Sequence, residues 1–125
     1  MTMLQPGLTA SVNHTVAEPD TAIALGSGEV PVLGTPRLIS LCEAATVTAV
    51  STHLAKGQTT VGIRVEIDHL AATPVGAGVA VTATLDRLEG NLLFFSVVAS
   101  AGGRKVAEGA IHRSIVDRKR FLDRL

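Results

Sequence analysis

Three polar side chains lie in stretches that are otherwise apolar, and their types can support acid–base or nucleophilic chemistry: Thr35, Glu43 and His69. Glu43 lies within LISLCEAATVTAV, where a carboxylate is costly unless it is paired or hydrogen-bonded. Carboxylates in such surroundings are often functional. Glu43 is therefore a candidate nucleophile or general base, the alternative being a helix residue that reaches solvent at one edge of the helix.

His69 ends a run of alternating side chains that is typical of a strand. Successive strand side chains point to opposite faces, so His69 continues the apolar face and Asp68 continues the charged face. The apolar row consists of Thr59, Val61, Ile63, Val65, Ile67 and His69. A break at Thr73-Pro74 follows, and a histidine beside it can act as a general acid or base near pH 7. The alternative is a core histidine whose hydrogen bonds are satisfied.

The remaining histidines and the cysteine are weaker candidates for chemistry. None of His14, His53 and His112 has a neighbour at metal-ligand spacing, so no metal site is expected. Cys42 is the only cysteine, which excludes an intramolecular disulfide framework and a multi-cysteine zinc site. We interpret Cys42 as a small core residue in a protein of a reducing, cytoplasmic compartment.

The segment GTPRLISLCEAATVTAVSTHLAKG predicts one long helix. Thr35 is a good N-cap, Pro36 suits the first helical position, and Gly57 suits the C-terminal stop. The helix is apolar nearly all round, which predicts burial. Thr35 and Glu43 are eight residues apart, about two turns, so the two can border one pocket. A helix N-terminus favours a developing oxyanion, although Thr35 can equally be a cap and nothing more.

Other elements are predicted on both sides of this helix. Residues 7–17 resemble a strand, and the glycines and prolines of residues 18–34 indicate a loop. Four strand-like runs follow at 59–69, 78–89, 91–101 and 104–116, with turns at EGN and AGGR, and residues 117–125 form a basic tail. A strand, a loop, an apolar helix and a four-strand meander predict an α+β hotdog fold, in which an antiparallel sheet wraps around one long central helix. We expect one domain over residues 1–125 and a homodimer or higher assembly, because an edge strand needs a partner.

Composition excludes several classes of protein. The chain of 125 residues has 46% hydrophobic residues, no Trp or Tyr, three Phe and a formal net charge of zero. Few aromatics and no net positive charge argue against a nucleic-acid partner. The longest apolar stretch, LLFFSVVASAGG, is too short to span a bilayer, and the start MTMLQPGLTA lacks the features of a secretory signal.

Two segments resemble the hotdog-fold acyl-CoA thioesterases of the fluoroacetyl-CoA thioesterase-like group: LGTPRLISLCEAA and DHLAATPVG. The resemblance implies that Thr35, Glu43 and His69 are the catalytic residues. It also places Gly62 where the family has a glycine associated with the acyl carbonyl. The end EGAIHRSIVDRKRF is similar to the family's last strand, with Arg113 and Phe121 in register.

The resemblance implies hydrolysis of an acyl-CoA, or a related acyl thioester, to the free acid and thiol, with no cofactor apart from the coenzyme A of the substrate. Arg113, Arg118 and Lys119 are candidate contacts of the CoA phosphates, the alternative being a solvated surface. The loop AIALGSGEVPVL contains no Phe, whereas the family's namesake has a Phe lid there, so we expect a different acyl group.

Two other functions stay open at this point. One is a non-catalytic acyl-CoA binding module that uses the same groove. The other is a hotdog enoyl-CoA hydratase, although the D-x-N-P-x-H arrangement of the hydratases is missing from the sequence.

Overall fold

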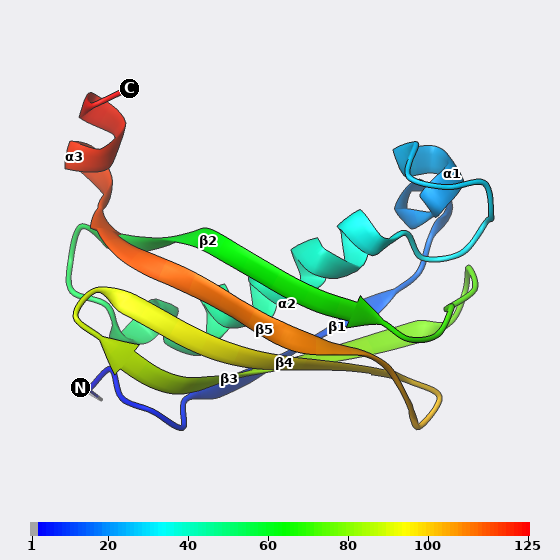
Figure 1. Cartoon of the computed structure of the whole chain (residues 1–125), viewed down its shortest axis with the longest axis horizontal. Helices are drawn as coiled ribbons and strands as arrows, with labels where there is room; N and C mark the ends of the chain where they lie inside the picture. The colour runs from blue at the N-terminus through cyan, green and yellow to red at the C-terminus, as the bar shows by residue number, and fades with distance from the viewer. Residues whose placement is uncertain (1–2) are drawn as a thin grey trace.

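A computed structural model describes residues 3–125, and its five strands form one antiparallel sheet that curves around a central helix (Figure 1). The strand order is β1-β3-β4-β5-β2. The strands are β1 (Thr9–Thr15), β2 (Gln58–His69), β3 (Gly78–Glu89), β4 (Leu92–Ala101) and β5 (Arg104–Asp117). Strands β3, β4 and β5 form a meander of three strands, and β1 and β2 are the two edges. The predicted four-strand meander is wrong for β2, which pairs with β5 and not with the next strand in sequence, β3. The hotdog fold predicted from the element order is confirmed.

The central helix α2 (Thr35–Val50) packs mainly against β1 and β3. Its buried stripe contains small and aliphatic residues at helical spacing: Leu38, Leu41, Cys42, Ala45, Thr46, Ala49 and Val50. The opposite face, with Ala44, Val47 and Thr48, is exposed, so the helix is not buried all round as its composition predicts. The helix also ends at Val50, before a short 3-10 turn (Ser51–His53), and not at Gly57.

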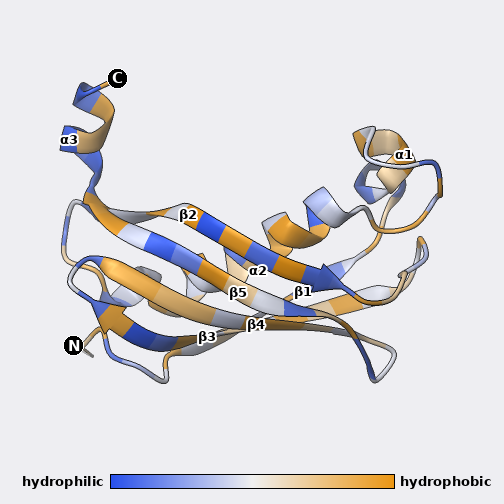
Figure 2. Ribbon diagram, viewed as in Figure 1, coloured by the Kyte–Doolittle hydropathy of each residue, from blue (hydrophilic) through white to orange (hydrophobic). Residues whose placement is uncertain are grey.

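The core lies between α2 and the concave face of the sheet. Its largest fully buried side chains include Leu38 from the helix, Leu85 from β3, Phe95 from β4 and Ile111 from β5. Apolar side chains dominate β4, as its continuous apolar run predicts, while polar and apolar residues alternate along β2 (Figure 2). The protein thus fills its core with aliphatic side chains and little aromatic volume.

A β-bulge in β2 changes which residues face the helix. Gly62 pairs with Arg113 of β5, but the next paired residue is Arg64, opposite His112, so Ile63 is an extra residue. Before the bulge, Thr60 shares the inner face with Ile115; after it, Val65 shares that face with Ile111. The predicted single row from Thr59 to His69 is therefore wrong for Thr59 and Val61, whereas Val65, Ile67 and His69 do share one face.

Gly109 of β5 allows a close approach of β5 to β2. A Cβ atom at this position would overlap the carbonyl oxygen of Glu66 in β2. Only glycine fits there, and the close contact lies in the part of β2 that leads to His69.

Short helices occupy both ends of the molecule (Figure 1). The predicted loop of residues 18–34 contains a 3-10 turn (Glu18–Asp20) and α1 (Ala22–Leu25), which lie near the N-terminus of α2. The basic tail forms α3 (Arg118–Asp123) at the opposite end, where Asp117 accepts a hydrogen bond of 2.9 Å from the backbone N–H of Arg120. Within residues 3–125, no helix is long and apolar enough to cross a membrane.

Candidate active site

Thr35 and His69 come together although they are 34 residues apart in the chain. Thr35 is the first residue of α2, and His69 is the last residue of β2. A hydrogen bond of 2.8 Å joins Thr35 Oγ1 to His69 Nδ1. The other ring nitrogen, Nε2, is buried and has no hydrogen-bond partner among residues 3–125. Since buried polar atoms are nearly always paired, a ligand or a second chain is expected to complete this end of the ring.

Burial lowers the pKa of His69 below its usual value, because a charged imidazolium loses solvation there. The neutral ring is therefore favoured near pH 7. When the Thr35 hydroxyl donates to Nδ1, the neutral ring carries its proton on Nε2, which makes Nε2 a hydrogen-bond donor.

The start of α2 is held by a tightly packed glycine. Gly34 is the N-cap, which corrects the prediction that Thr35 has this role. A Cβ atom on Gly34 would lie 2.8 Å from Cδ1 of Leu25 and 3.1 Å from the backbone of Ala22, so α1 rests directly against the cap. The Thr35 side chain is thereby free to bond His69, and the first N–H groups of the helix have no acceptor within the helix.

An open cleft of about 380 Å³ lies beside this pair and is lined by Gly34, Thr35 and His69. Most of the remaining lining is aliphatic: Ala22, Val30, Val32, Leu33, Leu70, Ala71 and Ala72. The cleft therefore joins aliphatic side chains to one imidazole, the hydroxyls of Ser27 and Thr35, and a helix N-terminus.

Glu43 forms a second polar group, two helical turns from Thr35. Arg113 Nη1 donates to Glu43 Oε2 at 3.0 Å, while Arg113 Nε donates to Thr60 Oγ1 at 2.9 Å and Nη2 to the Thr60 carbonyl at 3.0 Å. Arg113 is only 6% exposed, whereas the Glu43 side chain is 37% exposed. Glu43 thus reaches the surface, and its carboxylate is held by a buried cation.

Gly62 leaves the space that the Glu43 carboxylate occupies. A Cβ atom at Gly62 would overlap Glu43 Oε2 and would lie 3.3 Å from Arg113 Nη1. The backbone φ angle of Gly62 is not positive, so the steric contact, and not the backbone conformation, requires glycine here.

The five predicted site residues thus form two groups in a single chain. Thr35 and His69 make one, and Glu43, Gly62 and Arg113 make the other. Within residues 3–125, no hydrogen bond joins the two groups, and Glu43 does not line the cleft beside His69. Eight residues of α2 separate Thr35 from Glu43, about 12 Å along the helix axis.

Thr60 is a member of the second group that the sequence analysis missed. Arg113 lies between Ile111 and Ile115 at strand spacing, which signals a buried arginine in need of acceptors. The pattern did not identify the acceptor, because the bulge at Ile63 moves Thr60 to the inner face. Burial lowers the pKa of Arg113, and the nearby Glu43 carboxylate partly opposes this shift.

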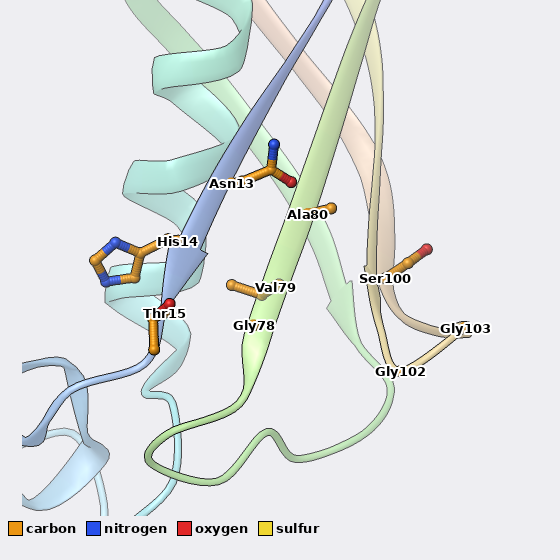
Figure 3. Close-up of a pocket in the computed structure, with 9 residues that line it drawn as sticks. All are labelled: Asn13, His14, Thr15, Gly78, Val79, Ala80, Ser100, Gly102 and Gly103. Atoms are coloured by element: carbon orange, nitrogen blue, oxygen red, sulfur yellow. The ribbon is translucent and has the colours of Figure 1, made fainter.

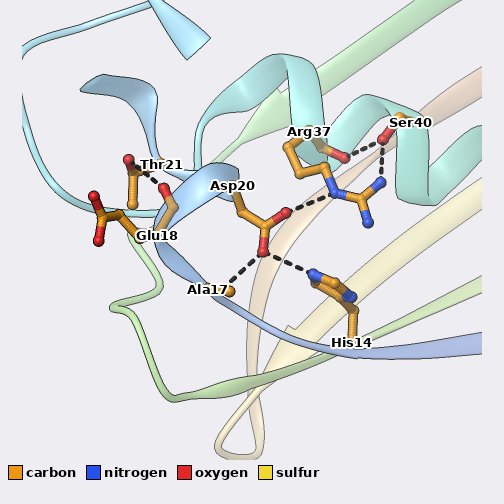
Figure 4. A network of polar contacts seen from close by, with 7 residues as sticks. All are labelled: His14, Ala17, Glu18, Asp20, Thr21, Arg37 and Ser40. Carbon is orange, nitrogen blue, oxygen red and sulfur yellow. Dashed lines mark hydrogen bonds and ion pairs between the residues drawn. The ribbon is translucent and has the colours of Figure 1, made fainter. Parts of the chain in front are cut away.

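A third polar network fixes the segment before α2 (Figure 4). Asp20 accepts hydrogen bonds from the backbone N–H of Ala17 at 2.8 Å and from Arg37 Nε at 2.9 Å, and it lies 2.8 Å from His14 Nε2. The Ala17 N–H and the His14 ring lower the pKa of Asp20 to about 2. This network ties β1 and the 3-10 turn to the first turn of α2, which carries Thr35.

A shallow cavity of about 400 Å³ lies at the ends of β1, β3 and β4 (Figure 3). It includes His14, Gly78 and Ser100, but none of the predicted site residues. His14 already bonds Asp20, and in Figure 3 its ring points away from Ser100.

Burial raises the pKa of Cys42 to about 11, which keeps this thiol protonated and inert. Within residues 3–125, no cluster of three or more His, Cys, Asp or Glu residues can hold a metal ion.

Known proteins share this architecture along nearly the whole chain. A crystal structure of a mutant of the fluoroacetyl-CoA-specific thioesterase FlK superposes with a TM-score of 0.92 at 26% identity, covering 99% of this chain and 96% of that one. The FlK mutant in complex with fluoroacetate and CoA gives a TM-score of 0.88 at 27% identity, over 94% and 99% of the two chains. A Thermus thermophilus protein, a thioesterase superfamily member, shares the fold with a TM-score of 0.90 at 24% identity, over 98% and 91%.

Sequence comparison identifies the same group of proteins. The fluoroacetyl-CoA thioesterase of Streptantibioticus cattleyicolor is 33% identical over 90 residues, which is 72% of this chain and 65% of that relative. The sequence pattern of the family of fluoroacetyl-CoA-specific thioesterases matches residues 16–119.

The sheet wrapped on α2 and these similarities place the chain among the thioesterase-like hotdog proteins. Within this class, the chain belongs to the fluoroacetyl-CoA-specific thioesterase (FlK) family.

Proposed function

We propose that the protein hydrolyses an acyl-CoA, or a related acyl thioester, to the free acid and the thiol. The observation that carries this proposal is the Thr35–His69 pair at the N-terminus of α2, beside an apolar cleft, in a chain of the FlK family. Hydrolysis needs an electrophilic carbonyl, an attacking oxygen and a proton for the leaving thiolate. The substrate supplies the carbonyl, and the two polar groups of the chain polarise it, direct the attack and stabilise the departing thiolate.

The N-terminus of α2 binds the thioester carbonyl oxygen. The unpaired N–H groups of the first turn and the positive end of the helix dipole stabilise the negative charge that develops on this oxygen. Thr35 orients the His69 ring through Nδ1, and the Nε2–H of the neutral ring donates a hydrogen bond to the departing sulfur. The thiolate then takes up the proton that the attacking water releases.

Glu43 supplies the attack on the carbonyl carbon, either with its own oxygen or through a water molecule that it deprotonates. Arg113 fixes the carboxylate through Oε2, and Gly62 leaves room for it. Single-turnover hydrolysis in ¹⁸O-labelled water separates the two routes. Label in the Glu43 carboxylate shows a mixed anhydride that water opens at the Glu43 carbon. Mass spectrometry after rapid quenching detects the acyl adduct on Glu43 whichever carbon water attacks, whereas a general base forms no adduct.

The two polar groups meet between two copies of the chain. Strand β2 is an edge of the sheet, and its Ile63 and Val65 are 54% and 39% exposed. Val47 of α2 is also apolar and is 43% exposed. An exposed edge strand of 12 residues with apolar side chains is a pairing surface. Antiparallel pairing of β2 with its own copy gives a two-fold dimer with one continuous sheet.

This pairing shortens the path from His69 to a Glu43 group. In its own chain, Gly62 lies seven residues before His69, about 23 Å along an extended strand. If the two strands pair over their full length, His69 faces Gln58 of the partner subunit, four residues or about 13 Å from the partner's Gly62. The two side chains and the bound thioester span the remaining distance. Each dimer then has two sites, each with Thr35 and His69 from one subunit and Glu43 from the other.

The same arrangement brings α3 to the cleft of the other subunit. The Arg118 N–H donates to the Gly57 carbonyl at 2.9 Å, so α3 begins beside the start of β2. We expect Arg118 and Lys119 to lie near the CoA phosphates at the mouth of this cleft. Arg113, which is buried and bound to Glu43, positions the carboxylate instead.

Steady-state thiol release from a panel of acyl-CoA substrates tests the proposed activity. We expect turnover that depends on Glu43 and His69. An absence of thiol release from every thioester in the panel, with tight acyl-CoA binding retained, would contradict hydrolysis and support a binding module.

Mixed dimers test the shared site. Glu43→Gln and His69→Ala homodimers are each expected to be nearly inactive. After dissociation and reassociation of equal amounts, half of the dimers are mixed, and each has one intact site, so activity returns to about a quarter of the wild-type value. Sites contained within one subunit predict no recovery, and sedimentation of a monomer at micromolar concentration would rule out the dimer.

A further inference from the structure

The cleft beside His69 has walls that are fixed by backbone hydrogen bonds. Its first wall is the segment before α2, where the Leu33 N–H donates to the Thr73 carbonyl at 2.9 Å and the Gly34 N–H to the Asp20 carbonyl at 2.9 Å. A further bridge joins Val32 to Pro74, which connects the first wall to the segment after His69. The cleft is thus formed before any substrate binds.

Both walls present aliphatic side chains to the cleft. Val30, Val32 and Leu33 line the first wall, and Leu70, Ala71 and Ala72 follow His69 on the second. Val30 and Leu70 are each 55% exposed, so their apolar surface is available for burial by a ligand. Such burial is favourable in proportion to the apolar area that is removed from water.

The part of the cleft beyond Thr35 and His69 has no charged side chain to balance an anionic group. Among residues 3–125, those that line the cleft include no Lys, Arg, Asp or Glu, and the polar side chains on the lining are Ser27, Thr35 and His69. Glu29 lies between Gly28 and Val30 in the sequence and adds negative charge next to this wall. A carboxylate bound in the cleft would therefore lose hydration without gaining a cation.

We propose that this cleft selects uncharged aliphatic acyl groups longer than acetyl and rejects acyl groups that end in a carboxylate. The inference rests on the proposed thioester hydrolysis, because it assigns the cleft to the acyl part of the same substrate. The carbonyl lies at Thr35 and His69, and the alkyl chain extends between Val30 and Leu70.

The first test compares kcat/KM for acetyl-, fluoroacetyl-, butyryl- and succinyl-CoA with the full-length wild-type protein. Each buried methylene is expected to raise kcat/KM by about fourfold, so butyryl-CoA, with two more methylenes, exceeds acetyl-CoA by roughly 15-fold. Succinyl-CoA, of similar length to butyryl-CoA, falls at least about tenfold below butyryl-CoA because its carboxylate lacks a partner. Equal values for acetyl and butyryl, or a preference for succinyl, would overturn the inference while leaving hydrolysis intact.

Binding provides a measurement that does not depend on turnover. Calorimetry with Glu43→Gln is expected to give a lower Kd for butyryl-CoA than for succinyl-CoA, by at least about tenfold. Equal affinities for the two ligands would overturn the inference, whether or not the protein hydrolyses thioesters. A lack of hydrolysis would contradict the proposed function, and the thiol-release assay tests that separately.

Matched arginine substitutions place the selectivity in the cleft. Val30→Arg puts a cation on the first wall, whereas Val75→Arg alters a valine that is 50% exposed and lies outside the cleft lining. Val30→Arg is expected to raise the succinyl-to-butyryl ratio of kcat/KM by at least about tenfold, and Val75→Arg is expected to leave it unchanged. The same ratio in both variants would show that the cleft does not hold the acyl group.

Discussion

The two ends of the β2–α2 contact contain polar groups of opposite character. At the end with Thr35 and His69, the ring nitrogen Nε2 is buried and has no hydrogen-bond partner in the part of the chain that the structure describes, and the group faces a cleft. At the end with Glu43, three hydrogen bonds from Arg113 fix the group, and a glycine leaves room for the carboxylate. The first group can bind a hydrogen-bond acceptor of a ligand through His69 Nε2. The second group already has its hydrogen bonds within the chain, and its carboxylate reaches the surface.

This difference shows why neither end is a complete site. An imidazole with a free nitrogen can transfer a proton, but it needs a nucleophile or base close to the same substrate. A carboxylate fixed by an arginine has a defined direction, but it needs a substrate within reach. Pairing of two chains satisfies both needs, because each end then completes the other.

The largest expected effect comes from Glu43→Gln, which keeps the hydrogen bond to Arg113 but removes the anionic and basic oxygen. We predict a loss of about 10³-fold in kcat with the fold and assembly retained. Glu89→Gln in β3 is the matched control, since the Glu89 side chain is exposed and, among the described residues, bonds only Arg87. A folded Glu43→Gln protein with near-normal turnover would remove Glu43 from the mechanism.

His69→Ala is expected to lower kcat by about 10²-fold, with a smaller change in acyl-CoA affinity. This substitution removes the hydrogen-bond donor to the leaving sulfur but leaves the aliphatic walls and the helix N-terminus in place. His14→Ala, His53→Ala and His112→Ala should each reduce kcat far less. If one of these three folded variants loses as much kcat as His69→Ala, the assignment of His69 to the active site is contradicted.

Gly62→Ala should reduce kcat by about tenfold, because a methyl group displaces the Glu43 carboxylate from its position. The control is Gly78→Ala in β3, where an added Cβ meets nothing within 4 Å. Kinetics and thermal unfolding of both variants separate the lost alignment from lost stability. Equal kcat values in the two variants would show that the carboxylate does not need this position.

The smallest expected effect is a displaced pH dependence. Burial lowers the pKa of His69, so the neutral ring should persist to a lower pH than an exposed histidine allows. Activity that requires the neutral ring is present above this lowered pKa and is lost as the pH falls through it. The acid limb of kcat/KM assigned to His69 should therefore lie below pH ~6.5 and disappear from the residual activity of His69→Ala. A limb above that value would place His69 in a solvated or anionic environment.

The sequence predicted the elements well because each has a local signal. Alternation in β2 and β3, turn glycines between the strands and the Gly-Thr-Pro start of α2 depend on neighbouring residues only. The position of His69 on the inner face followed from the same alternation, which holds from Val65 to His69. The family resemblance identified which of the polar residues to expect in the site.

The relations between these residues were not accessible from local patterns. The bulge at Ile63 depends on the pairing of β2 with β5, and it turns Thr60 inward to meet Arg113. The bond between Thr35 and His69 required Gly34 to take the capping position. The separation of Glu43 from His69 in one chain depends on the lengths of helix and strand that run between them.

Gly109 has a consequence for how the chain finds its fold. A shift of β5 by two residues against β2 would keep the same faces inward, but it would bring Ala107 or Ile111 opposite the Glu66 carbonyl, where no Cβ fits. A register shifted by two residues is thus disfavoured, because a Cβ atom would overlap the Glu66 carbonyl oxygen. Of the registers that keep the apolar faces inward, the native one avoids this overlap. Filling this gap with Gly109→Ala should slow refolding and favour misassembled sheets, because a methyl group would then collide in the native register as well and the preference for that register would be lost.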